Sequence, residues 1–476
     1  MSEKRDLTRR EVVQMAGAVT AAAAASKLTG APGIQKVKAA NNQIQYGMIG
    51  TGSRGTYLLR HLKGIDTGHC AALCDVWDPS LKEAAETIGT NPKRYKDYRE
   101  LLSDKNVEAV FVVTPLYKHF PVTKDALLAG KHVFCEKSLV FKPEEIHELR
   151  ALANERNKQI LQVGLQRRYS QFYQAVKDMI DKGTLGKVTH IRGQWHRNTI
   201  AKDPWNKPVP QGRTDKEQNW RKYREFSGGL TAELGSHQMD VADWFFGSPF
   251  EYVVGVGGQD FLHDGRDIFD NIQLIFKYPK GQKFIYTSIT TNGSLDLLRS
   301  ERREFGEVIM GTDGAVHITL GGDDFPATAI WFPEPPKPSV TPAKKENVKA
   351  GATIATGAAA KGLPIFLDKD RITGNESFLE REAKFARRWL GNKGILMPEE
   401  IKNPVDVELE SFFNDVRTGN KPKADLEVGL ADSAGVMLAN AAMYEERRAL
   451  YSEIEKWKPG TAPAKPGAAP VGAKKI

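Results

Sequence analysis

A glycine-rich turn near the start of the chain constrains the fold more than any other feature. Residues 43–49 are typical of a short strand, Gly50-Thr51-Gly52-Ser53-Arg54-Gly55 follows, and a helical pattern of leucines comes next. Gly50 permits a tight turn, Gly52 lets the backbone approach a pyrophosphate, and Gly55 lets the helix pack closely on the strand. The N-terminus of that helix offers N–H groups and a positive dipole end to phosphates. We therefore expect all six residues to bind a dinucleotide.

An acidic residue ends the next apolar stretch. Residues 71–74 are typical of a strand, and Asp75 follows directly, 25 positions after Gly50. A carboxylate at this place accepts hydrogen bonds from the ribose hydroxyls of adenosine. Its charge would repel a 2′-phosphate, and no Arg or Lys follows it closely. The pattern therefore favours NAD, with NADP as the less favoured cofactor.

Further apolar strands alternate with helical patterns. The strands expected are 109–113, 132–135 and 160–164. Continuous apolar strands separated by helices indicate a parallel sheet with both faces covered. Residues 43–165 are therefore predicted to form an α/β Rossmann domain.

After Gly164 the pattern changes to strands that follow one another. We expect helices over 170–182, 405–418 and 427–446, and strands over 188–196, 251–257, 271–277, 283–291, 306–311 and 315–320. This series predicts an α+β domain over 166–457 with a large, mainly antiparallel, open-faced sheet. Two segments rich in Pro, Ala, Gly and Lys are expected to be a flexible insertion (333–362) and a disordered tail (458–476).

The basic charge of the chain is concentrated at its ends. The net charge is +9, of which residues 1–40 carry +4 and residues 458–476 carry another +4. A basic binding face on the body is therefore not supported, and we expect no nucleic-acid partner.

The N-terminal 40 residues have the layout of an export signal. A charged start that includes Arg9-Arg10 precedes the alanine-rich apolar stretch 12–26, and Val37-Lys38-Ala39-Ala40 offers a small-residue cleavage site. Thr8-Arg9-Arg10-Glu11-Val12-Val13 resembles a twin-arginine motif, although valine replaces its usual aromatic residue. An ordinary export signal or an uncleaved anchor is the alternative. We expect a periplasmic protein without a membrane segment in its mature form. Because free NAD is scarce outside the cytoplasm, we also expect a tightly bound cofactor.

Cysteine and histidine show no metal-binding pattern. The three cysteines, Cys70, Cys74 and Cys135, lie in apolar stretches and are expected to be buried thiols. The histidines are scattered, and Glu233 with His237 lacks an apparent third ligand. We therefore expect no metal site.

These features together resemble the family of glucose–fructose oxidoreductase, inositol dehydrogenase and the rhizopine-catabolism oxidoreductase (Gfo/Idh/MocA), over residues 43 to 457. The marks of the resemblance are the glycine turn, Asp75, Thr114-Pro115 with His119, Glu136-Lys137, Gly229 with Glu233-Leu234-Gly235-Ser236-His237, Gly311-Thr312-Asp313-Gly314 and Lys421-Pro422-Lys423-Ala424-Asp425. Two positions depart from the family pattern: Ser138 stands where proline is usual, and Glu233 where aspartate is usual.

The resemblance implies bound NAD(P), a sugar-like polyol substrate, and a homodimer or homotetramer formed through the C-terminal sheet. It assigns Thr114, Pro115, His119 and Glu136 to the cofactor site, together with Lys137. Oxidation of a carbinol needs a group that takes the hydroxyl proton and donors that stabilise the developing charge. By the resemblance, Lys137 and His237 do this. His237 is favoured as the acid/base because its ordinary pKa lies near neutrality.

Other polar and aromatic residues are weaker candidates. Glu233 lies one helical turn before His237, which could bring both side chains to one pocket if the segment is helical. The alternative is a simple acid at a helix N-terminus. Arg168, Trp195, His196 and Trp220 could form a sugar-binding wall or could be structural. Asp240 and Asp243 are expected to be solvent-facing helix acids.

Three functions remain open on sequence grounds. The favoured one is an NAD(P)-dependent oxidoreductase acting on the CH–OH group of a sugar, glycoside or cyclitol. The second is a redox-neutral glycosidase of the same fold, which oxidises a ring carbon, eliminates the aglycone and returns the hydride. The third is a non-catalytic nucleotide-binding protein, against which the presence of both Lys137 and His237 argues.

Overall fold

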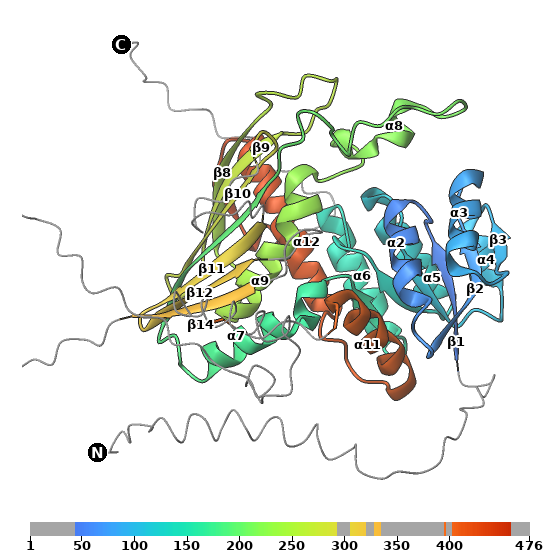
Figure 1. Cartoon of the computed structure of the whole chain (residues 1–476), viewed down its shortest axis with the longest axis horizontal. Helices are drawn as coiled ribbons and strands as arrows, with labels where there is room; N and C mark the ends of the chain where they lie inside the picture. Colours follow the sequence, from blue (N-terminus) through green and yellow to red (C-terminus); the bar gives the residue numbers. More distant parts are fainter. Residues whose placement is uncertain (1–42, 293–304, 320–327, 335–394, 397–401, 458–476) are drawn as a thin grey trace, which may run out of the picture. The chain divides into compact units, whose positions relative to one another are not determined.

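The computed structural model describes residues 43–292, 305–319, 328–334, 395–396 and 402–457. Its first sheet has six parallel strands in the order β3-β2-β1-β4-β5-β6. Figure 1 labels β1, β2 and β3 of this sheet, in blue. The strands are β1 (Ile44–Ile49), β2 (Gly68–Cys74), β3 (Lys93–Tyr95), β4 (Ala109–Val112), β5 (His132–Cys135) and β6 (Leu161–Val163). This is the strand order of a Rossmann sheet, which confirms the predicted fold. Only β3 has no counterpart in the sequence analysis, because it is short and charged.

Helices connect these parallel strands. They are α2 (Ser53–Leu62), α3 (Asp78–Ile88), α4 (Tyr98–Ser103), α5 (His119–Leu128) and α6 (Pro143–Glu155), with the 3₁₀ turn η1 (Leu116–Lys118) before α5. Proline stands in the first turn of α3 and α6, where its missing N–H costs nothing. Asp97 caps α4 by accepting a hydrogen bond from the N–H of Arg99.

The second sheet has nine described strands in the order β14-β13-β12-β11-β7-β10-β9-β8-β15. They are β7 (Val188–His196), β8 (Tyr252–Gly258), β9 (Asn271–Lys277), β10 (Lys283–Ile289), β11 (Phe305–Gly311), β12 (Gly314–Thr319), β13 (Thr328–Pro333), β14 (Ile395–Leu396) and β15 (Ala449–Leu450). Only β7 and β10 pair in parallel, and the other neighbours pair antiparallel. The predicted mainly antiparallel sheet is confirmed.

Helices cover one face of this sheet. They include α9 (Ser236–Phe246) and α12 (Leu426–Tyr444). The other helical elements of this half are η2 (Gln166–Tyr169), α7 (Gln171–Asp181), α8 (Asp215–Gln218), η3 (Trp220–Lys222), the π-helical turn η4 (Thr231–Gly235) and α13 (Ser452–Glu455). A Cβ atom at Gly193 of β7 would lie 3.0 Å from the Gln238 side chain of α9, so the odd-numbered residues of β7 face the helices. On the opposite face Val256 and Ile275 are 66% and 47% exposed. The sheet is open on that side.

The chain returns to the first sheet near its C-terminal end. Helix α11 (Pro404–Thr418) falls in the range assigned to the second domain from sequence, but its Phe412 and Phe413 pack on Tyr46, Phe111 and Phe134 of the Rossmann sheet. A Cβ atom at Gly68 would lie 2.3 Å from the Phe413 ring, so this glycine makes room for α11. The Rossmann core is therefore completed by a distant segment.

Three sequence expectations concern segments outside the described residues. These are the export signal (1–40), the tail (458–476) and nearly all of the insertion (333–362). The cysteines are described, and all three are buried thiols as expected. No helix in the described ranges is long and apolar enough to cross a membrane.

Candidate active site

The glycine turn joins β1 to α2 at the carboxyl end of the first sheet. Gly50 has a φ of +92°, which favours glycine, and a Cβ atom at Gly55 would lie 2.2 Å from the carbonyl oxygen of Gly50. A Cβ atom at Gly52 would instead point into open space. The first N–H groups of α2 have no partners within the helix by geometry. The turn therefore fits a pyrophosphate, which is the cofactor group that the sequence predicts here.

Asp75 holds the next turn in place. Its carboxylate accepts hydrogen bonds from the backbone N–H of Thr51 at 2.8 Å and of Trp77 at 2.9 Å. The side chain is half-buried, and an ionised carboxylate has about four acceptor positions. Positions therefore remain for ribose hydroxyls beside the glycine turn.

Arg54 points from α2 toward the end of β5. Its Nε donates to Oε1 of Glu136 at 2.7 Å, and its NH2 group donates to Gln166 at 3.3 Å. The structure thus joins Arg54 and Glu136, two predicted cofactor-binding residues, in an ion pair with each other. The Arg54 side chain remains 31% exposed.

His119 links two loops at the same edge. Its Nε2 lies 2.9 Å from the carbonyl oxygen of Thr114, and its Nδ1 lies 2.8 Å from that of Ser138. A neutral ring donates to only one of these oxygens. Burial lowers the pKa of His119, although both carbonyls act in the opposite direction. His119 therefore fixes the loop that contains Thr114 and Pro115 against the loop that follows Lys137.

Lys137 joins the two halves of the site. It follows β5 of the first sheet, and its Nζ donates to the carbonyl oxygens of Ala232 at 2.7 Å and Glu233 at 2.8 Å. Both carbonyls belong to the π-helical turn η4, an irregularity that is frequent at functional sites. An ammonium group has three donors, so one remains for a substrate oxygen. Burial lowers the pKa of Lys137, with the carboxylates of Glu233 and Glu136 opposing this shift. The peptide bond to Ser138 is cis.

Glu233 is held as a carboxylate by a neighbouring cation. Its Oε2 accepts a hydrogen bond from Nε of Arg221 at 2.6 Å. Burial acts to raise the pKa of Glu233, but Arg221 and Lys137 outweigh it and hold the pKa below its usual value. Arg221 was not predicted from the sequence, in which it follows Trp220 directly. Trp220 packs against it, with the guanidinium 4.2 Å from the ring centroid.

His237 is the second residue of α9, one turn beyond Glu233. Burial lowers its pKa well below the ordinary value of 6.5, and the positive charge of Lys137 adds to this effect. The ring is therefore neutral at neutral pH. Its Nδ1 is buried and has no hydrogen-bond partner within the described residues.

Unpaired polar atoms gather around Lys137 and His237. Within the described residues, four buried atoms on or beside the elements that hold these two side chains lack a partner: the hydroxyls of Thr114 and Ser236, Nδ1 of His237 and Nε1 of Trp195. Buried polar groups are normally hydrogen-bonded. A bound ligand rich in hydroxyl groups would offer these atoms hydrogen-bond partners.

The predicted sugar-binding wall is only partly assembled. Trp195 stacks near His237, with ring centroids 6.0 Å apart and an interplanar angle of 25°. His196 is the next residue of β7, so its side chain points to the open face, where its Nε2 lies 2.9 Å from Oγ1 of Thr287. The structure therefore brings Trp195 to the site but leaves His196 on the far side of the sheet.

Arg168 forms an ion pair inside the protein. It binds the carboxylate of Asp240 at 2.7 Å, and its guanidinium lies 5.2 Å from the ring centroid of Trp244. Asp240 is only 3% exposed, and Asp243 accepts a hydrogen bond from Tyr278 at 2.5 Å. The expectation that both acids face solvent is wrong, because the sheet covers one side of α9 and η2 supplies Arg168 on another.

A second buried carboxylate lies near Lys137. Asp432 of α12 is 2% exposed, and burial together with the nearby Asp240 raises its pKa to about 7. The sequence analysis missed this residue. A single acid within the apolar run 428–443 was the signal that could have found it, since a charge in such a helix is seldom without a role.

The structure also contains a cavity that lies away from Lys137 and His237. A cavity of about 630 Å³ is lined by residues that include Lys202, Asp203, Phe261, His263 and Arg266, and neither Lys137 nor His237 borders it. We place the site at Lys137 because the charged and unpaired groups converge there. No cluster of three or more potential metal ligands occurs in the described ranges.

Two family models match the chain. Residues 44–165 match an oxidoreductase family with an NAD-binding Rossmann fold (GFO/IDH/MocA), and residues 173–317 match the C-terminal domain of that same family. Together the matches span more than half of the chain. The chain belongs to the GFO/IDH/MocA family of oxidoreductases. Its Rossmann domain is the family's NAD-binding domain, and the expected family and cofactor are confirmed.

Curated relatives support this assignment. The chain is 30% identical to the myo-inositol 2-dehydrogenase of Thermotoga maritima over 45% of its own length and 58% of the relative's. It is 28% identical to the inositol 2-dehydrogenase of Salmonella typhimurium, over 44% of its length and 56% of the relative's. The chain thus spans less than two thirds of the length of these relatives.

Solved structures share the fold. A scyllo-inositol dehydrogenase from Lactobacillus casei, with bound NAD(H) and scyllo-inositol, has a TM-score of 0.58 at 18% identity. An aldose–aldose oxidoreductase from Caulobacter crescentus, complexed with glycerol, has a TM-score of 0.60 at 18% identity. Both similarities cover 86% of this chain and 99% of the other.

The charge of Lys137 should add to the effect of burial in lowering the pKa of His237. Replacing Lys137→Met removes a positive charge beside the ring, so the pKa of His237 should rise toward its ordinary value of 6.5. NMR titration of isotope-labelled histidine, with the resonance assigned from His237→Gln, measures the change. The control is Lys182→Met. Lys182 follows the last residue of α7, and its side chain is 67% exposed. An identical His237 titration in the parent and in Lys137→Met would contradict the geometry described for the site.

Proposed function

We propose that this protein transfers hydride between a CH–OH carbon of a sugar, glycoside or cyclitol and NAD bound along the glycine turn. The observation that carries the proposal is the position of Lys137. Its ammonium group, fixed by the carbonyls of Ala232 and Glu233, lies between the nucleotide-binding edge and the neutral His237. The unpaired polar atoms near Lys137 and His237 favour a polyol substrate, and so do the inositol dehydrogenases among the relatives.

Each side chain has a separate task in this proposal. The nicotinamide, when bound, accepts the hydride from the carbon. His237 takes the hydroxyl proton, for which a neutral ring is required. Lys137 directs its remaining N–H toward the substrate oxygen and stabilises the developing negative charge. Arg221 keeps Glu233 ionised, and that carboxylate in turn supports the charge of Lys137.

Asp75 supports the proposed preference for NAD over NADP. Its carboxylate is fixed by two backbone N–H groups at the place of the adenosine ribose. A 2′-phosphate would stand beside this negative charge, which disfavours NADP.

The redox balance of the reaction tests the proposal. The full-length protein is incubated with inositols, free sugars and aryl glycosides, and both NADH absorbance and released aglycone are recorded. We expect NADH to accumulate in proportion to oxidised product. His237→Gln should lower kcat by about 10²–10⁴-fold, the usual contribution of a general base, while NAD affinity stays within about twofold. Release of aglycone without a net change in the cofactor spectrum would show the redox-neutral glycosidase instead.

We also propose that a second copy of this chain covers the open face of the second sheet. Apolar side chains project from that face, including Val256 and Ile275, which are 66% and 47% exposed. Exposed apolar patches on a sheet commonly mark association surfaces. Light scattering at micromolar concentration should give a dimer or tetramer, and Ile275→Glu should shift it toward the monomer. A monomeric parent protein would contradict this.

Export by the twin-arginine route is our proposal for the leader. It rests on Arg9-Arg10, followed by the apolar stretch 12–26. A protein that carries NAD outside the cytoplasm needs to fold around it first, and we propose that the cofactor stays tightly bound. The double variant Arg9→Lys with Arg10→Lys should remain in the cytoplasm on cell fractionation, while Lys36→Arg is exported like the parent. Equal export of the double variant would exclude this route.

A further inference from the structure

A long segment crosses from the second sheet to the nucleotide-binding edge. Between β7 and η4 the chain runs through residues 197–228, here called the arm, which include α8 and η3 (Figure 1). The arm supplies Arg221 to Glu233, as described above. It also reaches the first domain at two further places.

The first contact of the arm lies beside the expected adenosine site. The guanidinium of Arg213 stands 5.3 Å from the ring centroid of Trp77. Trp77 comes two residues after Asp75, and its backbone N–H donates to the Asp75 carboxylate at 2.9 Å. Between them Val76 is 79% exposed, an apolar side chain left open next to the ribose-binding acid.

The second contact lies further along the same edge. The rings of Phe226 and Tyr117 are 4.9 Å apart, and Tyr117 belongs to η1, which follows the loop containing Thr114. The arm therefore contacts the turns after β2 and β4, and it also reaches the catalytic residues through Arg221. These are the turns along which a dinucleotide lies in a Rossmann domain.

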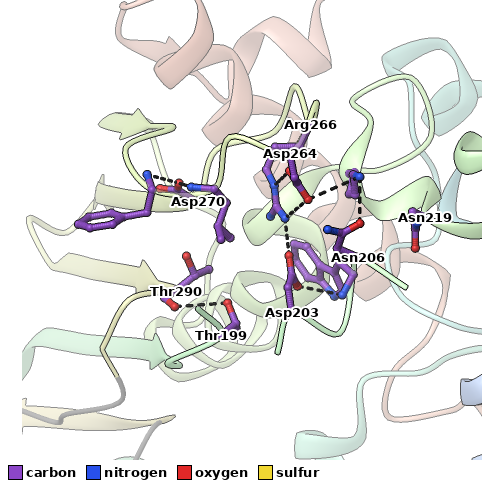
Figure 2. Close-up of polar contacts among 12 residues, drawn as sticks. Thr199, Asp203, Asn206, Asn219, Asp264, Arg266, Asp270 and Thr290 are labelled. Atoms are coloured by element: carbon purple, nitrogen blue, oxygen red, sulfur yellow. Dashed lines mark hydrogen bonds and ion pairs between the residues drawn. The ribbon is translucent and has the colours of Figure 1, made fainter. Parts of the chain in front are cut away.

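The base of the arm is fixed by a buried charge network (Figure 2). Arg266, only 5% exposed, binds Asp264 at 2.6 Å and also pairs with Asp203 of the arm. Lys222 of the arm, 3% exposed, donates to Asn206 at 3.2 Å and lies 3.5 Å from Asp264. Breaking a buried ion pair is costly, so the arm has a defined position before any ligand binds.

The loop that carries Arg266 is itself braced. Asp270 accepts hydrogen bonds from the backbone N–H groups of Phe261 and Leu262, each at 2.8 Å. Thr199, at the start of the arm, donates its N–H to the carbonyl of Thr290 at 2.8 Å, next to β10, and its hydroxyl donates to the same oxygen at 3.3 Å (Figure 2). These contacts hold the arm in one position before a ligand binds. Such preorganisation lowers the entropic cost of binding.

From these contacts we propose that Arg213 and Trp77 form a clamp for the adenine ring of the bound dinucleotide. The inference rests on the proposed function, because it assigns a further binding residue to the same cofactor. A planar guanidinium stacks on aromatic faces, and Arg213 already contacts the indole of Trp77, so an adenine ring that lies against Val76 meets the edge of this stacked pair. A cover contributed by the second domain slows release of the cofactor, which agrees with the proposed tight binding of NAD.

Binding of cofactor fragments tests the clamp. Dissociation constants of the full-length protein for NAD and ADP-ribose are measured by titration calorimetry, and NADH release is followed by stopped-flow displacement. Arg213→Ala should weaken NAD and ADP-ribose alike, by roughly tenfold, and speed NADH release by a similar factor, which is a typical loss for a stacking partner. The control Lys207→Ala removes an exposed cation from the same arm and should change neither value.

The outcomes separate this inference from the proposed function. Equal affinities of the parent and Arg213→Ala for ADP-ribose overturn the clamp and leave the proposed function intact. A much larger loss for NADP than for NAD overturns it too, because Arg213 would then serve a 2′-phosphate rather than the ring. A parent protein that binds no NAD overturns both. Thermal unfolding of each variant checks that it still folds. Trp77→Leu is a second test of the same contact, and it should weaken NAD and ADP-ribose as Arg213→Ala does.

Discussion

The ammonium group of Lys137 is the contact on which the rest of the site depends. It extends from the first sheet and donates to two carbonyl oxygens of a π-helical turn in the second domain. One charge thus aligns the nucleotide-binding edge with His237, lowers the pKa of that histidine and helps keep Glu233 ionised. Arg221 balances the charge from the side of the arm.

The second domain has two roles toward the first. It supplies His237, the proposed acid/base, through α9, and the carbonyl oxygens that hold Lys137 through η4. Through the arm it also extends over the nucleotide edge, and α11 completes the Rossmann core from the far end of the sequence. The two sheets therefore share one site even though each has its own strand order. A cofactor bound at that edge would be in contact with both domains.

Local patterns allowed much of this to be predicted. The glycine turn and Asp75 follow from short-range geometry, and the apolar periodicity placed the main strands of both sheets to within a few residues. The family resemblance supplied Lys137 and His237. The alternation along β7 already implied that Trp195 and His196 point to opposite faces, so placing both in one wall was an avoidable error.

Long-range contacts could not be predicted in the same way. Arg213, Arg221 and Asp432 reach the site from segments whose positions depend on the assembled fold. Asp240 was expected in solvent because the helix pattern alone does not show that Arg168 packs against it. The short strands β3 and β15 pair at sheet edges, where few apolar residues reveal them.

Direct transfer of hydrogen from substrate carbon to cofactor is the central claim, and isotope transfer tests it most directly. The full-length protein is incubated with oxidised NAD and an inositol that is deuterated at its ring carbons. The cofactor is then released, and its deuterium content is measured by mass spectrometry. The account predicts one deuterium on the nicotinamide ring for each oxidised product, and almost none with Lys137→Met. Oxidised product accompanied by undeuterated cofactor would contradict it.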